Sequence, residues 1–411
     1  MADSLEMSIL RRLAPIPTAS FFERPVHELL STVYAENFRS TKAVSCRIDQ
    51  WGNVIWHYAG DPNRLNPKSI ANVVHTDHPA FHVHNKFVDG TVWIKMMGGL
   101  NPDLVVGTEL DLHTTKNSFV NKGKVIGAVD AAEGNPSQRY VLKAETGEPA
   151  QFATINFGLE GRLIVDSGED LLRSPVMDDF SAIAMSIAAL REIVNRKLPI
   201  DIYTVFHRAE EVGLLGAHGV ARSGSIPLNA LVYSVENSSY KGKKNPESPI
   251  EQLAEIGGGI IIRTGDRSVP QYNETALELL RQARSSMENH KTQERLMTGG
   301  TCEAGIYGAH GFRVAGIAVP LKYYHNNGAL EGKFSFVPEE IHEGDFHAGT
   351  ALMVAAAETL ARDPKLYGEF KPTEPDANLA GLKDRIGKRF DAYAREGLLG
   401  LNGLVLAGRL S

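Results

Sequence analysis

Residues 202–220 read IYTVFHRAEEVGLLGAHGV, and this stretch indicates how the chain folds. Its first five residues form an apolar, β-branched run that is typical of a buried strand. Two adjacent glutamates, Glu210 and Glu211, come next, and a Gly-containing apolar segment then begins a helix. A buried strand that passes directly into a helix is the unit from which α/β proteins with a parallel sheet are built.

Three further apolar runs resemble this first strand. They are ANVVH (71–75), LVYSV (231–235) and VAGIAV (314–319). Apolar residues at helical spacing lie between the runs, for example Ile183, Ile187, Leu190 and Val194. The alternation predicts an α/β sandwich with a mostly parallel sheet.

Residues 86–169 interrupt this alternation. Short β-prone pieces such as TVWIKM, KVIGAV, RYVLKA and RLIVD occur there, separated by Gly, Asn, Pro and Asp. We expect a small β-rich domain inserted into the α/β domain, which then comprises residues 1–85 and 170–365. After a Pro-containing linker, KPTEPDAN, one helical face carries Leu382, Ile386, Phe390 and Tyr393. Residues 366–411 are therefore predicted to form a C-terminal helical extension that docks on the chain or binds a partner.

The composition excludes several classes of partner. The 411 residues include 43 Lys and Arg against 49 Asp and Glu, a formal charge of −6, whereas nucleic-acid and anionic-membrane binding need clustered positive charge. The N-terminal segment lacks the long apolar core of a signal peptide, and no later run is long enough to span a bilayer. Two cysteines, Cys46 and Cys302, are too few for a disulfide framework. We expect a cytoplasmic protein without nucleic-acid or membrane partners.

Side chains able to bind a metal follow the predicted strands. His75 and Asp77 lie at the end of the ANVVH run (71–75). There the carboxylate can orient the imidazole while the other ring nitrogen binds a metal. Glu236 and His325 follow two further strands. Each of these residues alone would more often be an ordinary loop residue, but the carboxyl ends of strands in open α/β sheets are where ligands bind.

Paired acids complete the set. Asp178 lies in SPVMDDFSA, just before a predicted helix, where an acid ordinarily caps free N–H groups and where the alternative is a carboxylate that bridges two metals. Of the neighbours Glu210 and Glu211, one can bind a metal while the other takes a proton from a water molecule beside it. The resulting mixture of nitrogen and oxygen ligands suits one or two divalent ions, zinc, manganese or cobalt.

In this order the His-x-Asp, Asp-Asp, Glu-Glu, Glu and His motifs resemble the glutamyl aminopeptidase and tetrahedral aminopeptidase family of the zinc exopeptidase superfamily. The segments that support the resemblance are IDQWGNVI (48–55), VVHTDHPAF, SPVMDDFSA, AEEVGLLGA, YSVENSS, GGGIIIRTGD (257–266), MTGGTCEAGIYG (297–308) and VPLKYYHN. The resemblance implies a three-layer α/β/α sandwich with a mixed, mostly parallel sheet. It also implies a homo-oligomer in whose assembly the inserted β-rich domain takes part.

The resemblance also implies a role for each candidate residue. One metal would be bound by His75 and Glu236, the other by Glu211 and His325, and both by a bridging Asp178, with Glu210 as general base and Asp77 as the partner that orients His75.

The chain departs from the family's usual pattern at positions expected near the substrate. Glu236 stands where the family usually has Asp, and Cys302 and Glu303 replace an expected Asp-Ala pair. The histidines after the His-x-Asp motif are unusual as well, and they are either extra donors around a small anionic substrate or, more simply, surface residues: His78, His82 and His84.

The leading hypothesis is a metal-dependent hydrolase, most simply an aminopeptidase that cleaves short peptides with a metal-activated water and Glu210 as base. The alternative is an aminohydrolase or amidohydrolase that acts on a C–N bond of a small non-peptide substrate, such as an aromatic amine or an N-acyl compound. A non-catalytic protein with a structural metal is disfavoured, because structural zinc sites are usually closed by Cys and His ligands.

Overall fold

The computed structural model describes residues 3–61, 68–86, 90–114, 119–129, 138–144, 150–158, 163–166, 168–240, 254–297, 299–371 and 375–399. Parts of the expected linker (372–374) and of the expected C-terminal extension (400–411) lie outside these residues. Within the described ranges, no helix is both long and apolar enough to cross a membrane.

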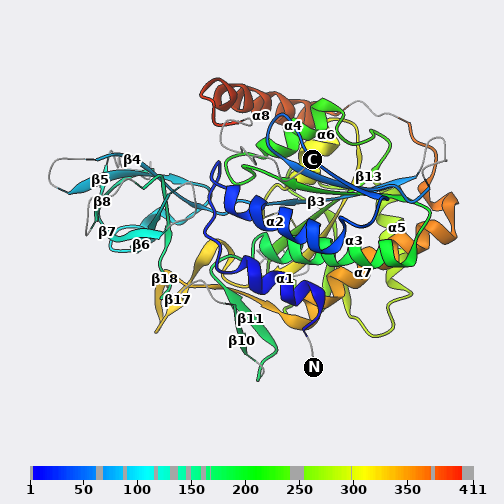
Figure 1. The fold of residues 1–411 in the computed structure, drawn as a ribbon, viewed down its shortest axis with the longest axis horizontal. Coiled ribbons are helices and arrows are strands. Elements are labelled where there is room, and N and C mark those ends of the chain that lie inside the picture. Colours follow the sequence, from blue (N-terminus) through cyan, green and yellow to red (C-terminus); the bar gives the residue numbers. More distant parts are fainter. Residues whose placement is uncertain are drawn as a thin grey trace.

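An eight-stranded mixed sheet forms the centre of the molecule (Figure 1). In spatial order its strands are β1 (Val44–Ile48), β2 (Val54–Tyr58), β12 (Asp201–His207), β3 (Ser69–His75), β13 (Leu231–Ser239), β16 (Arg313–Leu321), β14 (Ile260–Gly265) and β15 (Thr292–Leu296). The central strands β12, β3, β13 and β16 are parallel, whereas β2 and β14 run antiparallel to β12 and β16. The predicted α/β fold with a mixed sheet is confirmed, and the four apolar runs are its central parallel strands.

Helices cover both faces of this sheet (Figure 1). One face carries α1 (Leu5–Leu13), α2 (Arg24–Asn37), α3 (Phe180–Arg196), α5 (Glu274–Arg284) and α7 (Glu343–Arg362), and the other carries α4 (Leu215–Ser223), α6 (Glu303–Ala309) and α8 (Ala377–Arg395). Every residue of β3 and β16 is buried, as expected for strands covered on both sides. The core therefore lies on both faces of the sheet.

A closed six-stranded barrel follows β3 in the sequence and precedes α3. In space it projects from one side of the sandwich (Figure 1). Its strands are β4 (Ala80–Lys86), β5 (Thr91–Met97), β6 (Glu109–His113), β7 (Phe119–Val129), β8 (Arg139–Ala144) and β9 (Phe152–Ile155). The barrel has its own apolar core, which includes Phe81, Ile94 and Leu142. The barrel begins with β4, because Phe81 packs into that core, and its last strand, β9, ends at Ile155. Both bounds lie earlier in the sequence than those of the expected inserted domain, 86–169.

Two smaller β elements lie outside both the barrel and the central sheet. A three-stranded sheet contains β10 (Ile164–Asp166), β11 (Leu171–Ser174) and β19 (Glu339–His342), and a hairpin contains β17 (Asn327–Leu330) and β18 (Lys333–Phe336). The RLIVD piece assigned to the inserted domain thus contributes β10 to a separate sheet.

Helix α8 docks on this chain, against α4 and α6. Its buried residues are Leu382, Ile386 and Phe390, which lie on the predicted apolar face. The Phe390 ring meets the Trp51 ring edge-on at 4.7 Å, and Tyr393 packs partly buried against the same core.

Candidate metal centre

The candidate side chains converge at the carboxyl edge of the central sheet. They are placed by β3 (His75), by β13 (Glu236), by the segments that follow β12 (Glu210 and Glu211) and β16 (His325), and by the turn before α3 (Asp178). Because β12, β3, β13 and β16 are parallel neighbours, their carboxyl ends meet at the same edge.

Asp178 lies between two histidines. Its Oδ1 is 3.2 Å from His75 Nε2, and its Oδ2 is 3.7 Å from His325 Nε2. Glu236 Oε2 is 3.9 Å from the same His75 nitrogen, and Glu211 Oε1 is 3.4 Å from the same His325 nitrogen. Two ligand sets therefore share one carboxylate.

Within the described residues, three groups of side chains have ligand atoms that all lie within 4.8 Å of one another. They are His75, Asp178, Asp179 and Glu236; His75, Glu210 and Glu211; and Asp178, Glu211 and His325. Asp179 was not singled out from the sequence, and its carboxylate accepts hydrogen bonds from the His75 N–H and the Asn237 amide.

Both imidazoles present Nε2 to the acids. His325 Nδ1 lies 3.0 Å from the carbonyl oxygen of Gly99, and His75 Nδ1 lies 3.1 Å from that of Asp77. A carbonyl can only accept, so each Nδ1 carries a proton, and Nε2 is the ring nitrogen that can bind a metal once it has lost its own proton. Nε2 of His325 is buried without a hydrogen-bond partner among the described residues, as a nitrogen reserved for a metal would be.

The carboxylate of Asp77 mainly fixes the backbone beyond β12. It accepts the N–H groups of Glu210 (2.9 Å) and Glu211 (3.1 Å) and the hydroxyl of Ser20 (2.6 Å). Its Oδ1 is 3.7 Å from His75 Nδ1, farther than its own carbonyl oxygen. Asp77 therefore contacts His75 chiefly through its main chain and positions both glutamates through its side chain.

The acids of the cluster hinder one another's ionisation. Burial raises the pKa values of Glu210 and Glu236 well above their usual range, and neighbouring carboxylates raise them further. Burial also raises the pKa of Asp178, but the hydrogen bond with His75 and the charge of that ring outweigh it and the net pKa is lowered. A divalent cation would compensate such a cluster, so the donor set fits one or two metal ions.

Glu339 supports the site, and sequence reasoning missed it. One carboxylate oxygen accepts the N–H groups of Met177 (2.8 Å) and Asp178 (3.0 Å), and the other accepts the N–H of His325 (2.9 Å). Burial raises its pKa to about 7. No local signal separates Glu339 from its neighbour Glu340, because both follow a short hairpin in a polar stretch.

Two of the three extra histidines, His78 and His82, are hydrogen-bonded to other groups of the protein. His78 is buried, with Nδ1 2.6 Å from the carbonyl oxygen of Asp178 and Nε2 3.1 Å from Asn326 Oδ1. His82 is buried, with Nε2 2.9 Å from the carbonyl oxygen of Ser20, and only His84 is exposed. The surface interpretation is thus wrong for His78 and His82: His78 lies before β4 against the Asp178 turn, and His82 on β4 faces the connection between α1 and α2. Neither ring nitrogen of His78 is left free for a substrate.

Cys302 and Glu303 are both buried, and Glu303 lies beside Glu236. Glu303 is fully buried; its carboxylate accepts hydrogen bonds from His207 Nδ1 (3.0 Å) and the Ser234 hydroxyl (2.8 Å). Ser234 Oγ is also 3.3 Å from Glu236 Oε1. Helix α6 packs on β13, and Glu303 lies next to the candidate ligand Glu236; the expectation that these residues border the substrate stays a prediction.

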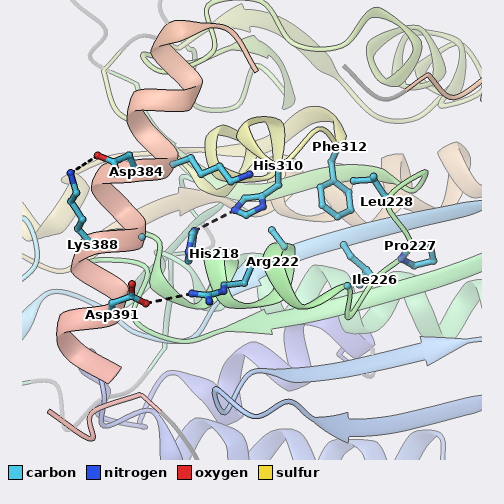
Figure 2. A pocket seen from close by; sticks show the side chains of 14 residues that line it. His218, Arg222, Ile226, Pro227, Leu228, His310, Phe312, Asp384, Lys388 and Asp391 are labelled. Atoms are coloured by element: carbon cyan, nitrogen blue, oxygen red, sulfur yellow. Dashed lines mark hydrogen bonds and ion pairs between the residues drawn. The ribbon is translucent and has the colours of Figure 1, made fainter. Parts of the chain in front are cut away.

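A groove with both polar and apolar lining residues lies under α8, away from this cluster (Figure 2). It encloses about 790 Å³ between α8, α4 and the end of α6. His218 and His310 point toward one another across it, 3.3 Å apart, and Arg222 and Asp391 form an ion pair at its edge. None of the candidate metal ligands lines this groove.

The comparisons with known proteins agree with the site. A family model described as M42 glutamyl aminopeptidase matches residues 142–331. The matched segment contains five of the seven candidate residues, namely Asp178, Glu210, Glu211, Glu236 and His325. The match confirms the family resemblance predicted from the sequence, and with it the prediction that the chain is a hydrolase. No curated protein matches the chain by sequence.

Solved structures share the fold over most of their length. An aminopeptidase from the archaeon Desulfurococcus kamchatkensis is 19% identical, with a TM-score of 0.70 over 90% of this chain and 98% of that chain. A TET aminopeptidase from a marine sediment archaeon of the Thaumarchaeota is 18% identical, with a TM-score of 0.67 over 92% and 99%. The TET1 peptidase of Pyrococcus horikoshii, described as assembling into a tetrahedron or a large octahedral shell, is 20% identical, with a TM-score of 0.66 over 86% and 99%.

Proposed function

We propose that this hydrolase is a metal-dependent aminopeptidase that cleaves short peptides. The observation that carries the proposal is the pair of ligand sets that share Asp178, each completed by a histidine nitrogen and a glutamate oxygen. In this assignment one metal is held by His75 and Glu236 and the other by Glu211 and His325, with Asp178 between them. Such a mixture of imidazole and carboxylate ligands suits zinc, manganese or cobalt.

Bound divalent ions would lower the pKa of a water molecule and polarise the scissile carbonyl. Glu210, held by the Asp77 carboxylate through its N–H group, takes the proton of the attacking water and returns it to the leaving nitrogen. Burial raises the pKa of Glu210, which makes its carboxylate a stronger proton acceptor than an exposed glutamate.

The peptide substrate is supported by the family match and by the aminopeptidases that share the fold. The alternative, a small non-peptide amide or amine, depended on free histidine donors near the substrate. His78 and His82 are engaged by protein groups, so no observation now favours that alternative.

We further propose that the chain assembles into a homo-oligomer and that the inserted β-rich region takes part in the assembly. Large apolar side chains are exposed on the barrel and on the β17–β18 hairpin beside it: Val106, Phe119, Ile126, Leu330 and Phe334. Exposed apolar groups of this size on one side of a molecule are typical of protein interfaces. A neighbour of the same fold is described as a dodecamer and another as a tetrahedral or octahedral shell.

The test is Glu210→Gln, assayed on aminoacyl arylamides after loading with manganese, cobalt or zinc. We expect unchanged metal content and a rate lower by about 10²- to 10⁴-fold, the usual contribution of a general base. Glu211→Gln is the matched control, because it removes a ligand and should lose metal together with activity. Full activity of Glu210→Gln contradicts the role of Glu210. Activity of the wild type on N-acyl amino acids or aromatic amines alone contradicts the peptidase.

A further inference from the structure

We propose that a second site, a cavity between the barrel and the α/β sandwich, binds a free apolar α-amino acid. The cavity encloses about 490 Å³, within the range of small-molecule sites. The outer face of β6, β7 and β9 forms one wall, and the connection between α1 and α2 forms the opposite wall together with Pro175 and Val176. The six candidate metal ligands and bases that meet at the sheet edge do not line it.

Two opposite charges face this cavity without forming an ion pair with each other. Asp111 on β6 and Lys122 on β7 are cross-strand partners and both line the cavity. Within the described ranges, neither side chain has an ion-pair partner within 4.0 Å. Asp111 keeps one hydrogen bond, from the Asn156 amide at 2.8 Å; burial raises its pKa, and the charge of the exposed Lys122 lowers it in part. A ligand with an ammonium group for Asp111 and a carboxylate for Lys122 satisfies both charges at once.

The rest of the lining is mostly apolar. Ile16, Val176, Ile155, Phe119 and Phe157 surround the space beyond the two charges. A zwitterion with an aliphatic or aromatic side chain therefore matches the cavity, whereas a strongly charged side chain would lose its hydration there without a partner. Free apolar amino acids have this chemistry.

The cavity adjoins the support of the metal centre. His78 and Asn326 line it, and they are hydrogen-bonded to one another. His78 also contacts the Asp178 carbonyl, and Asn326 follows His325 directly in the chain. An occupant of the cavity thus touches the residues that hold the proposed bridging ligand. If the proposed function holds, the ligand is a product of the reaction, and its binding couples product concentration to the active site.

The experiment is calorimetric titration of the full chain with leucine and with phenylalanine. We expect saturable binding that weakens at least tenfold in Asp111→Asn and in Lys122→Ala. The matched controls are Glu109→Gln and Lys124→Ala, a cross-strand pair on the same two strands that does not line the cavity. They should bind as the wild type does.

Two ligand analogues test the charges separately. N-acetyl-leucine lacks the ammonium group and leucinamide lacks the carboxylate, so each should bind at least tenfold more weakly than leucine. The proposal is overturned if leucine does not bind to the wild type or if Asp111→Asn binds leucine as tightly as the wild type does. It is also overturned if both analogues bind the wild type as tightly as leucine does. These binding measurements require no turnover, so they remain decisive if the chain hydrolyses no peptide. If the chain hydrolyses peptides but does not bind leucine in this cavity, only the second site is refuted.

Discussion

Glu339 connects two loops that come from distant parts of the sequence. A single buried carboxylate accepts the N–H groups of Met177 and Asp178 and the N–H of His325. A carboxylate can do this because both of its oxygens only accept hydrogen bonds when it is ionised. Glu339 therefore fixes the spacing between the shared ligand and one of the two histidines.

We predict that Glu339→Gln lowers metal affinity by about 10- to 100-fold, the usual cost of losing a group that supports a ligand. The glutamine amide would place N–H donors against a backbone donor, at a cost of roughly 1–3 kcal/mol in stability. Metal titration at pH 8, where the native carboxylate is ionised, measures the effect.

The control for this prediction is Glu340→Gln on the same strand. The Glu340 carboxylate pairs with Arg173 and Lys322 and contacts none of the candidate ligands. Its loss should leave metal affinity unchanged, and equal effects of the two substitutions would refute the role given to Glu339.

At the scale of the element, α8 covers two neutral histidines. Burial, together with the positive charges of Arg222 and Lys383, lowers the pKa of His218 to about 4 and that of His310 to about 3. Asp391 acts in the opposite direction on His218 alone. In the unfolded chain both side chains would titrate near pH 6.5.

The unfolded state therefore binds more protons than the folded state between pH 6.5 and about 4, so stability must fall as the pH falls through this window. We predict a loss of roughly 1 kcal/mol for each histidine at pH 5.5 relative to pH 7. Urea unfolding of the wild type and of the double variant His218→Asn, His310→Asn at both pH values measures it. The double variant should lose less stability on acidification, and parallel losses would contradict the assignment.

At the scale of the whole molecule, the β17–β18 hairpin follows His325 closely in the chain and lies near the barrel (Figure 1). Leu330 and Phe334 on this hairpin are 62% and 73% exposed. Among the residues that the structure describes, no other large apolar side chain is as exposed. Such exposure is costly for an isolated chain and is relieved when another subunit covers the hairpin.

We predict that Leu330→Ser with Phe334→Ser yields a smaller assembly than the wild type in sedimentation velocity. The control is Lys333→Ala on the same hairpin, which removes a charge and leaves the apolar surface in place. An unchanged sedimentation coefficient in the double serine variant would exclude this hairpin from the interface.

Local sequence determined the central strands and the side chains that follow them. Apolar runs encode buried strands because a strand covered on both faces is apolar throughout, and a polar residue after such a run lies at the sheet edge. The sequence alone therefore predicted the strands that contain or precede His75, Glu236 and His325.

Only the tertiary structure decided which of these residues meet and what supports them. From the sequence alone, Asp178 could equally have been a helix cap. In the structure the Asp77 side chain mainly holds the two glutamates and not His75, and Glu303 is buried beside Glu236. Barrel closure likewise moved the boundary of the inserted region to β4. These outcomes depend on hydrogen bonds and packing between segments far apart in the chain, such as those of Glu339, and no pattern within a single segment carries that information.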